Sequence, residues 1–361
     1  MGEDQLTSEE KAFYRMAARQ LEKQNFDENK AWVKVCNKIQ KNTLRVYIRR
    51  FCRYAAIFLV LSMTALFIWV YTQRKEQEPL WATASPAIVP GTNKAELILA
   101  SGEKLILGQS VEVTRVVQPG VFVMVDTLNG RVSYVNETEE QDSLVVYNML
   151  SVPKGGEYTL TLADGTTVWL NSESSIKFPV RFQGQKREVH LEGEAFFKVK
   201  HDTTAPFHVY AGGDDICVLG TSFNVCAYSG ESFWHTTLVE GKVIVRHEGQ
   251  ELRLNPSGQY QLNTVTREVK VQNVDTELYT SWMNGKLFFK GFRLEDIVRQ
   301  LERWYDFNMF YENEDLKELK FRGVINKYDS FDTVLKILEQ TTDIQFTIHG
   351  NTVVARKIFR K

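Results

Sequence analysis

The sequence predicts a multi-domain membrane protein. Its parts are a short α-helical N-terminal segment, one transmembrane helix, an all-β domain beyond the membrane and a small C-terminal α/β domain. Three observations predict this fold class. Residues 54–73 carry no charge over the length of a membrane-crossing helix. Residues from about 79 to 274 alternate between apolar and polar side chains in short runs, as β-strands do. After residue 282 the apolar residues recur at helical spacing.

Length and composition limit the classes of protein that fit. The 361 residues suffice for two or three domains, and 43% hydrophobic and 25% charged residues are ordinary for a folded protein. A net charge of −1 gives no reason to expect direct nucleic-acid binding. No CxxC occurs, and all six histidines follow residue 189, so we predict no metal and no cofactor. Cys217 and Cys226 form either a disulfide or two buried thiols.

Residues 1–53 are predicted to be helical. Thr7 and Glu10 fit a capping box, so a helix is expected through about Gln24, and a second begins near Asp27. The second helix carries a basic stripe and a roughly opposite apolar face; the stripe comprises Lys30, Lys34, Lys38, Lys41, Arg45 and Arg49, and the face Trp32, Val35, Ile39 and Val46. Such a short segment lacks a robust core of its own. Either Trp32, Val35 and Ile39 dock on a cytoplasmic protein, or the segment rests on the lipid bilayer.

Residues 54–73 are predicted to be the transmembrane helix. Twenty helical residues span roughly 30 Å, which matches the hydrocarbon core of a bilayer. Residues 29–53 carry eight basic side chains and no acid, whereas the linker 74–90 begins with balanced charges. The positive-inside rule therefore places the N-terminus in the cytoplasm and the bulk of the chain outside.

Residues 91–275 are predicted to form the all-β domain, a sandwich or an irregular solenoid of short strands. Tyr158–Leu170 alternates on both sides of Asp164-Gly165, which indicates a hairpin. A weaker copy, Leu97–Leu107, turns at Ser101-Gly102.

Five motifs in this domain carry a family resemblance. LADGTTVWLNSESSIKFP, REVHLEGEAFFKV, PFHV, VLGTSFNVCAY and LVEGKVIV follow PKGGEYTL in order, over about residues 150–250. Together they resemble the FecR family. The matching motif residues are Asp164, Gly165, Leu170, Asn171, Gly193, Glu194, Phe197, Gly220, Thr221, Phe223 and Gly241.

The resemblance implies a single-pass anti-sigma factor of the bacterial inner membrane, similar to the Bacteroidetes version. Its cytoplasmic segment would bind an extracytoplasmic-function sigma factor. Its periplasmic domain would receive a signal from the signalling domain of an outer-membrane TonB-dependent transporter. For some members the resemblance also implies self-cleavage between Gly220 and Thr221, where the alternative is a simple tight turn. Because no nucleophile with a base accompanies Asp164, His190, Glu192 and Glu194, we expect no enzyme.

Residues 282–361 are predicted to form a duplicated helix–strand module. Two sets of apolar residues share helical spacing at an offset of 37; they are Leu294, Ile297, Val298, Leu301 and Trp304, then Phe331, Val334, Leu335 and Leu338. Strands are expected at Phe307–Tyr311, Leu319–Val324, Gln345–Ile348 and Thr352–Arg356. The module resembles the short N-terminal domain of secretins and TonB-dependent receptors. Its sheet edges suit strand addition by a partner, or else it only stabilises the β domain.

Two functions fit the sequence. The first is a transmembrane anti-sigma factor that relays a transporter's signal to transcription. The second is a membrane-tethered periplasmic binding or scaffold protein whose inner segment is only an anchor. Recovery of a sigma factor on the N-terminal segment distinguishes them.

Overall fold

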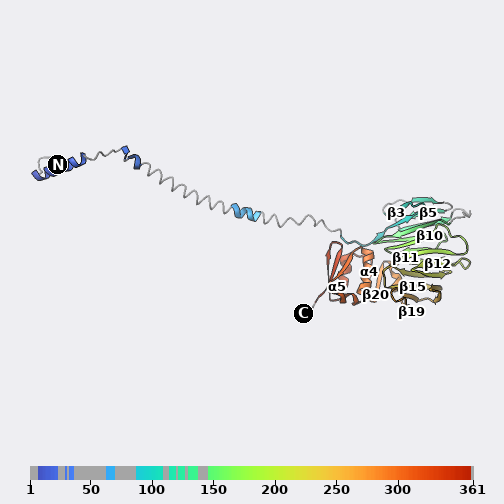
Figure 1. Ribbon diagram of the computed structural model, residues 1–361. Coiled ribbons are helices and arrows are strands. Elements are labelled where there is room, and N and C mark those ends of the chain that lie inside the picture. Colours follow the sequence, from blue (N-terminus) through green and yellow to red (C-terminus); the bar gives the residue numbers. More distant parts are fainter. Residues whose placement is uncertain are drawn as a thin grey trace. The chain divides into compact units, whose positions relative to one another are not determined.

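The computed structural model describes residues 7–22, 29–30, 32–35, 62–69, 87–108, 114–118, 121–126, 129–136 and 145–358 (Figure 1). The chain has two compact units, Met1–Thr83 and Ala84–Lys361. The first contains short helical pieces, and the second contains all the strands that the described residues form.

The first unit begins with the helix α1, Ser8–Glu22. Thr7 donates its backbone N–H to Glu10 Oε2 at 3.0 Å, which confirms the predicted capping contact. Residues 29–30 and 32–35 are also helical. Most of the predicted basic stripe, together with Ile39 and Val46, lies outside the described residues.

The predicted fold class needs a correction at the transmembrane helix. No helix in the described ranges is long and apolar enough to cross a membrane. Within the predicted span, the structure describes the helical residues 62–69, and 54–61 and 70–73 lie outside its described part. The described fold is instead mostly β.

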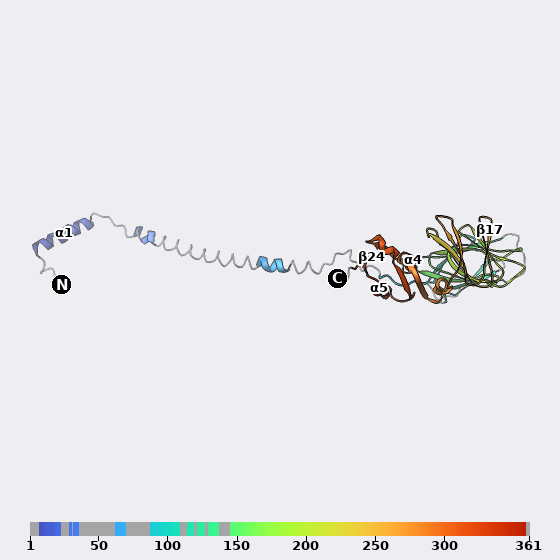
Figure 2. The ribbon, with the colours of Figure 1, turned by 90° about the horizontal axis from the view of Figure 1, so that it is seen from below.

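The β domain in the second unit consists of two layers of strands (Figures 1 and 2). The pairings order the first layer as β3 (Lys104–Leu107), β2 (Ala95–Ile98), β7 (Tyr147–Val152), β10 (Ser174–Pro179), β11 (Arg187–Lys198), β12 (Phe207–Ala211), β13 (Asp214–Val218), β16 (Val243–His247) and β17 (Gln250–Leu254). They order the second as β4 (Thr114–Gln118), β5 (Val121–Asp126), β6 (Arg131–Asn136), β8 (Gly156–Thr161), β9 (Thr167–Leu170), β11, β14 (Ser222–Ala227), β15 (Phe233–Glu240), β18 (Gly258–Asn263) and β19 (Val269–Asn273). The short strand β1 (Thr92–Asn93) pairs with β8.

Both predicted hairpins are confirmed. Strands β8 and β9 pair antiparallel around Asp164-Gly165, and β2 and β3 pair antiparallel around Ser101-Gly102. Gly165 has a φ of +89° and Gly102 a φ of +86°, a backbone region that glycine enters without strain.

Strand β11 belongs to both layers, and it changes layer at Gly193. Glu192 pairs with β10 of the first layer, whereas Gly193 pairs with Ala227 of the second. Gly193 has a φ of +94°, and a Cβ there would lie 2.4 Å from Ser174 Oγ. Only glycine fits this crossing.

The core of the β domain lies between the two layers. Side chains alternate between buried and more exposed positions along the strands, as in β10 and β16. The buried ones form one hydrophobic cluster that includes Leu150, Ile176, Val209 and Leu238. Cys217 and Cys226 are both free thiols.

The C-terminal module follows the β domain. Its elements are α3 (Glu277–Thr280), the 3-10 helix η2 (Ser281–Asn284), β20 (Lys286–Arg293), α4 (Leu294–Tyr305), β21 (Asn308–Tyr311), the 3-10 helix η3 (Glu314–Glu318), β22 (Lys320–Asn326), α5 (Phe331–Gln340), β23 (Ile344–His349) and β24 (Thr352–Lys357). Strands β20 and β22 form one sheet, and β21, β24 and β23 form another. The two predicted helices and four predicted strands are confirmed. Strand β20 was not predicted.

The module and the β domain share a hydrophobic cluster. Phe196 of β11 is buried among the apolar residues of α4, β20 and α5, and Trp169 of β9 packs against the same cluster. The C-terminal module is therefore docked on one face of the β domain, which positions the site described next.

Candidate functional site at the docked face

We use "docked face" for the side chains of the second layer that meet the C-terminal module: Trp169, Asn171, Glu194, Phe196, Asn224, Cys226 and His235. The strand register explains their grouping. Glu194 lies opposite Cys226, which lies opposite His235, and Phe196 lies opposite both Trp169 and Asn224. Their sequence neighbours Phe197 and Val225 point into the core instead. This layer is therefore covered on both sides.

Glu194 is the centre of a hydrogen-bond network on the docked face. Its two carboxylate oxygens accept from Asn171 Nδ2 at 2.8 Å and Asn224 Nδ2 at 2.9 Å. Its backbone N–H donates to Ser174 Oγ. Burial raises the pKa of the Glu194 carboxyl, while the two amide hydrogen bonds oppose that shift. The network holds three strands and the turn after β9 in one arrangement.

The module contacts this network directly. Trp282 of η2 donates its Nε1–H to Asn224 Oδ1 at 3.3 Å. Trp169 and Phe196 meet edge to face beneath the module, with ring centroids 5.8 Å apart. A hydrogen bond and the shared hydrophobic cluster thus hold the module at the same place.

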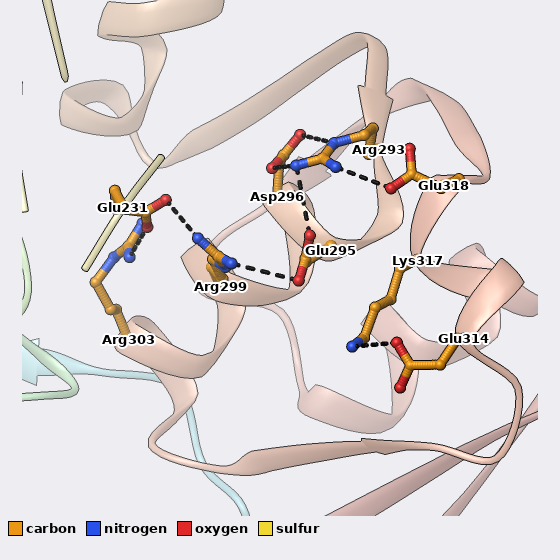
Figure 3. Close-up of polar contacts among 9 residues, drawn as sticks. All are labelled: Glu231, Arg293, Glu295, Asp296, Arg299, Arg303, Glu314, Lys317 and Glu318. Carbon is orange, nitrogen blue, oxygen red and sulfur yellow. Dashed lines mark hydrogen bonds and ion pairs between the residues drawn. The ribbon is translucent and has the colours of Figure 1, made fainter. Parts of the chain in front are cut away.

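Ion pairs from helix α4 form a second anchor (Figure 3). Glu231, in the turn between β14 and β15, accepts from Arg299 Nη1 at 3.1 Å and from Arg303 Nη1 at 2.6 Å. The Arg303 guanidinium also lies 4.0 Å from the Tyr228 ring centroid. Arg299 continues to Glu295 within α4 (Figure 3). One carboxylate of the β domain therefore forms ion pairs with two cations of the module.

Lys327 supplies a third anchor. Its Nζ donates to Glu157 Oε2 of β8 at 2.7 Å and lies 3.8 Å from the Trp304 ring centroid. Tyr328 donates its hydroxyl to the other oxygen of Glu157. Burial lowers the pKa of the Lys327 ammonium, and Glu157 opposes that shift. The module is thus held by charge at two separate points.

The predicted motif residues fall into several structural groups. Leu170, Phe197 and Phe223 are buried in the core. Asn171 and Glu194 meet on the docked face. Gly165, Gly193 and Gly241 all have positive φ at changes of chain direction, and the Gly241 turn lies against Thr221.

Asp164 of the hairpin turn is part of a buried ion pair. Its Oδ2 accepts from Arg187 Nη1 at 2.7 Å, and the side chains are 14% and 4% exposed. Arg187 also donates to the backbone oxygens of Lys200 and Ala205. The motif aspartate thereby ties its hairpin to the loop after β11.

Gly220 and Thr221 lie in a bend before β14. Thr221 is buried and donates its hydroxyl to the Lys242 backbone oxygen at 3.0 Å. A Cβ at Gly220 would lie 2.6 Å from His201 Cα, so a close backbone approach explains this glycine. Self-cleavage at this dipeptide stays a prediction.

The predicted docking residues of the first unit are exposed where the structure describes them. Trp32 is 68% and Val35 45% exposed, and Ile39 lies outside the described residues. Helix α1 adds three exposed apolar side chains that the sequence did not single out: Phe13, Tyr14 and Met16. Their signal was present in the sequence, since Phe13 and Met16 are one helical turn apart.

Sequence reasoning also missed most partners at the docked face. Asn224 lies in a quoted motif, but Trp282, Arg303, Glu231 and Lys327 gave no local signal. Their partners lie 58 to 170 residues away along the chain, so only the folded structure brings them together.

Comparisons with known proteins place the chain in a family. Residues 148–244 match the FecR protein family, and residues 286–355 match the FecR C-terminal family. Two crystal structures of a candidate anti-sigma factor from Parabacteroides distasonis ATCC 8503 are similar to the chain. One is 31% identical, with a TM-score of 0.55 over 58% of this chain and 99% of that one. The other is 30% identical, with a TM-score of 0.56 over 59% and 100%. No curated protein is a significant match. The chain therefore belongs to the FecR family of anti-sigma factors, which are regulatory proteins of signal transduction.

Proposed function

We propose that the chain binds an extracytoplasmic-function sigma factor through residues 1–53 and relays to it a signal from an outer-membrane TonB-dependent transporter. The signal would enter through the β domain and the C-terminal module. The observation that carries this proposal is the set of exposed apolar side chains in the first unit.

These side chains are suited to a protein partner. Phe13, at 74% exposure, and Met16 lie one turn apart on α1, and Tyr14 is their neighbour. Trp32 and Val35 repeat the same spacing in the next helical stretch. A 15-residue helix whose apolar side chains are exposed to water is marginally stable. Burying aromatic side chains against a partner supplies roughly 1.5–3 kcal/mol for each, so a sigma factor would both cover and stabilise this segment.

The test is a reporter of sigma-factor activity in cells that carry the full chain. Phe13→Asp and Trp32→Asp should each release sigma activity, because a carboxylate cannot enter an apolar contact without a large desolvation penalty. Arg15→Asp is the matched control, since Arg15 points away from Phe13 and Met16 on the same helix. Unchanged output in both test variants, with protein levels equal by immunoblot, would count against this docking surface.

The transporter's signalling domain is proposed to bind the C-terminal module by strand addition. Strands β21 and β23 are the outer strands of the three-stranded sheet, so each has an edge to offer. Phe310 on β21 is 58% exposed, and Ile348 on β23 is also exposed. Phe310→Lys should abolish the transporter-dependent response without changing sigma binding. A normal response would exclude β21 as the contact.

We also propose that the protein is located at the bacterial inner membrane, with its N-terminus in the cytoplasm and its strand-rich part in the periplasm. The basic, acid-free stretch 29–53 supports this orientation. Protease added to spheroplasts should remove the β domain and leave an N-terminal tag protected; loss of the tag would exclude the orientation.

A further inference from the structure

We propose that Glu194, Cys226 and His235 form a binding site for Zn²⁺, or a similar divalent transition-metal ion, beneath the C-terminal module. The site is independent of sigma-factor binding. It departs from the sequence-based prediction that the protein has no metal.

The three residues form a row across three adjacent strands. Glu194 on β11 lies opposite Cys226 on β14, and Cys226 lies opposite His235 on β15. Directly opposed side chains on one face have Cβ atoms about 4.5–5.5 Å apart. One donor atom from each residue lies within 4.8 Å of the other two. A sheet thus supplies three donors from rigid backbone positions.

The donor set suits zinc. Thiolate, imidazole and carboxylate are its usual ligands, at about 2.0–2.3 Å from the ion. Tetrahedral ligands at those distances stand about 3.3–3.8 Å from one another. The distances between the three donor atoms would therefore have to shorten by about 1 Å for all three to bind one ion, and rotation of the side chains can achieve this.

A cavity provides room for the ion. It measures about 70 Å³ and is lined by all three donors, with Tyr279 and Trp282 of the module covering it. A water occupies about 30 Å³ in the liquid, so an ion and one water as fourth ligand fit. The sequence gave no sign of this arrangement, because the donors come from separate strands without a CxxC spacing.

The surroundings support ligand geometry. Asn171 and Asn224 hold the two oxygens of Glu194 and fix its orientation, as outer hydrogen bonds do for metal ligands.

Charge balances on binding. The Cys226 thiol loses its proton to solvent as the S–metal bond forms, and the resulting thiolate and the Glu194 carboxylate together offset the two positive charges of the ion. The neighbouring cations Arg303 and Lys327 are already paired with Glu231 and Glu157. The positive charges of Arg303 and Lys327 are thus offset by carboxylates, which reduces their repulsion of the bound ion.

The test is titration of the purified full chain, reduced and freed of metal by a chelator, with Zn²⁺ and with Co²⁺. We expect one ion for each chain with a dissociation constant below about 1 μM, and a thiolate-to-cobalt charge-transfer band in the near ultraviolet. Cys226→Ser and His235→Gln should each weaken binding by more than about 100-fold, beyond the effect of losing an outer hydrogen bond.

Cys217→Ser is the matched control, because it removes a thiol outside the cavity, and it should bind as the unmodified chain does. The proposal is overturned if the unmodified chain shows no stoichiometric binding and no cobalt band. It is equally overturned if Cys226→Ser keeps the band. The band of the unmodified chain shows that a thiolate binds the ion, and its loss in a folded Cys226→Ser chain but not in Cys217→Ser assigns that thiolate to Cys226; a circular dichroism spectrum equal to that of the unmodified chain shows that each variant is folded.

Discussion

The ion pair between Lys327 and Glu157 should respond unequally to removal of its two members. The Lys327 side chain is only 2% exposed and Glu157 is 19% exposed. Replacing Glu157 with Gln leaves a buried ammonium ion without its counter-charge. Replacing Lys327 with Met keeps the aliphatic stem beneath Trp304 and removes the charge that burial disfavours.

The magnitudes follow from these surroundings. Removing one partner of a buried ion pair costs about 3–5 kcal/mol, and the partial exposure of Glu157 favours the lower end, about 3 kcal/mol. Lys327→Met loses two cation–π contacts, of which the one with Trp282 is distant, and one hydrogen bond, but it regains the desolvation penalty, so its net effect should lie within about 1 kcal/mol of zero. In a domain of this size 1 kcal/mol corresponds to about 2–4 °C in Tm, so Glu157→Gln should lower Tm by about 6–12 °C.

Thermal unfolding of the full chain, followed by tryptophan fluorescence, is the assay. The Trp282 and Trp304 rings both lie near the Lys327 ammonium, at 5.6 Å and 3.8 Å from their centroids, and their fluorescence reports the docked module. The double variant should recover most of the stability that Glu157→Gln loses, because it no longer contains a bare buried charge. If Lys327→Met destabilises as much as Glu157→Gln, the attraction outweighs desolvation and the reasoning is wrong.

Three further predictions concern other charged groups. Asp164→Ala should lower the unfolding free energy by about 3–4 kcal/mol because it leaves Arg187 buried without its carboxylate, and Asp164→Asn should lower it by nearly as much because it removes the same charge; a much smaller loss for Asp164→Asn in urea unfolding would argue against the charge as the cause. Glu231→Gln should weaken docking by about 1–2 kcal/mol, given its partly exposed partners on α4, and hydrogen exchange in α4 should accelerate; unchanged exchange would contradict the anchor role. The hydrogen bond with the Cys217 thiol, aided by Asp215, raises the pKa of His208. The charged imidazole therefore stabilises the folded state fully below pH 6.5, the ordinary pKa of histidine, and this stabilisation is lost as pH rises through the higher pKa of the folded state. Urea unfolding at a series of pH values should show this loss for the unmodified chain and should not show it for His208→Gln.

Local chemistry made much of the second unit predictable. The Asp164-Gly165 hairpin needs a turn residue that adopts positive φ and two flanking strands with alternating side chains, and both features are visible within the thirteen residues Tyr158–Leu170. Helices α4 and α5 follow from apolar spacing alone, because each has a single buried face.

The rest depends on contacts that no short stretch of sequence encodes. Strand β20 was not predicted because Leu287–Phe289 is an apolar run without alternation, and such a run does not distinguish a strand from a helix. The docked face was not predicted because the hydrogen-bond partners of Glu194 come from β14 and from the turn after β9, and the tryptophan that contacts this network comes from η2. The predicted transmembrane helix rested on the length of an uncharged segment and on its basic flank, and the structure does not contain a helix of that kind within its described residues.

Direct titration of the purified full chain with an extracytoplasmic-function sigma factor of its host tests the central claim. We predict a one-to-one complex with a dissociation constant below about 1 μM, weakened at least 100-fold (about 2.7 kcal/mol) when Phe13 and Trp32 are both replaced by Asp. The Arg15→Asp chain should bind as the unmodified chain does. Absence of a complex, or equal affinity in the doubly substituted chain, would contradict the account.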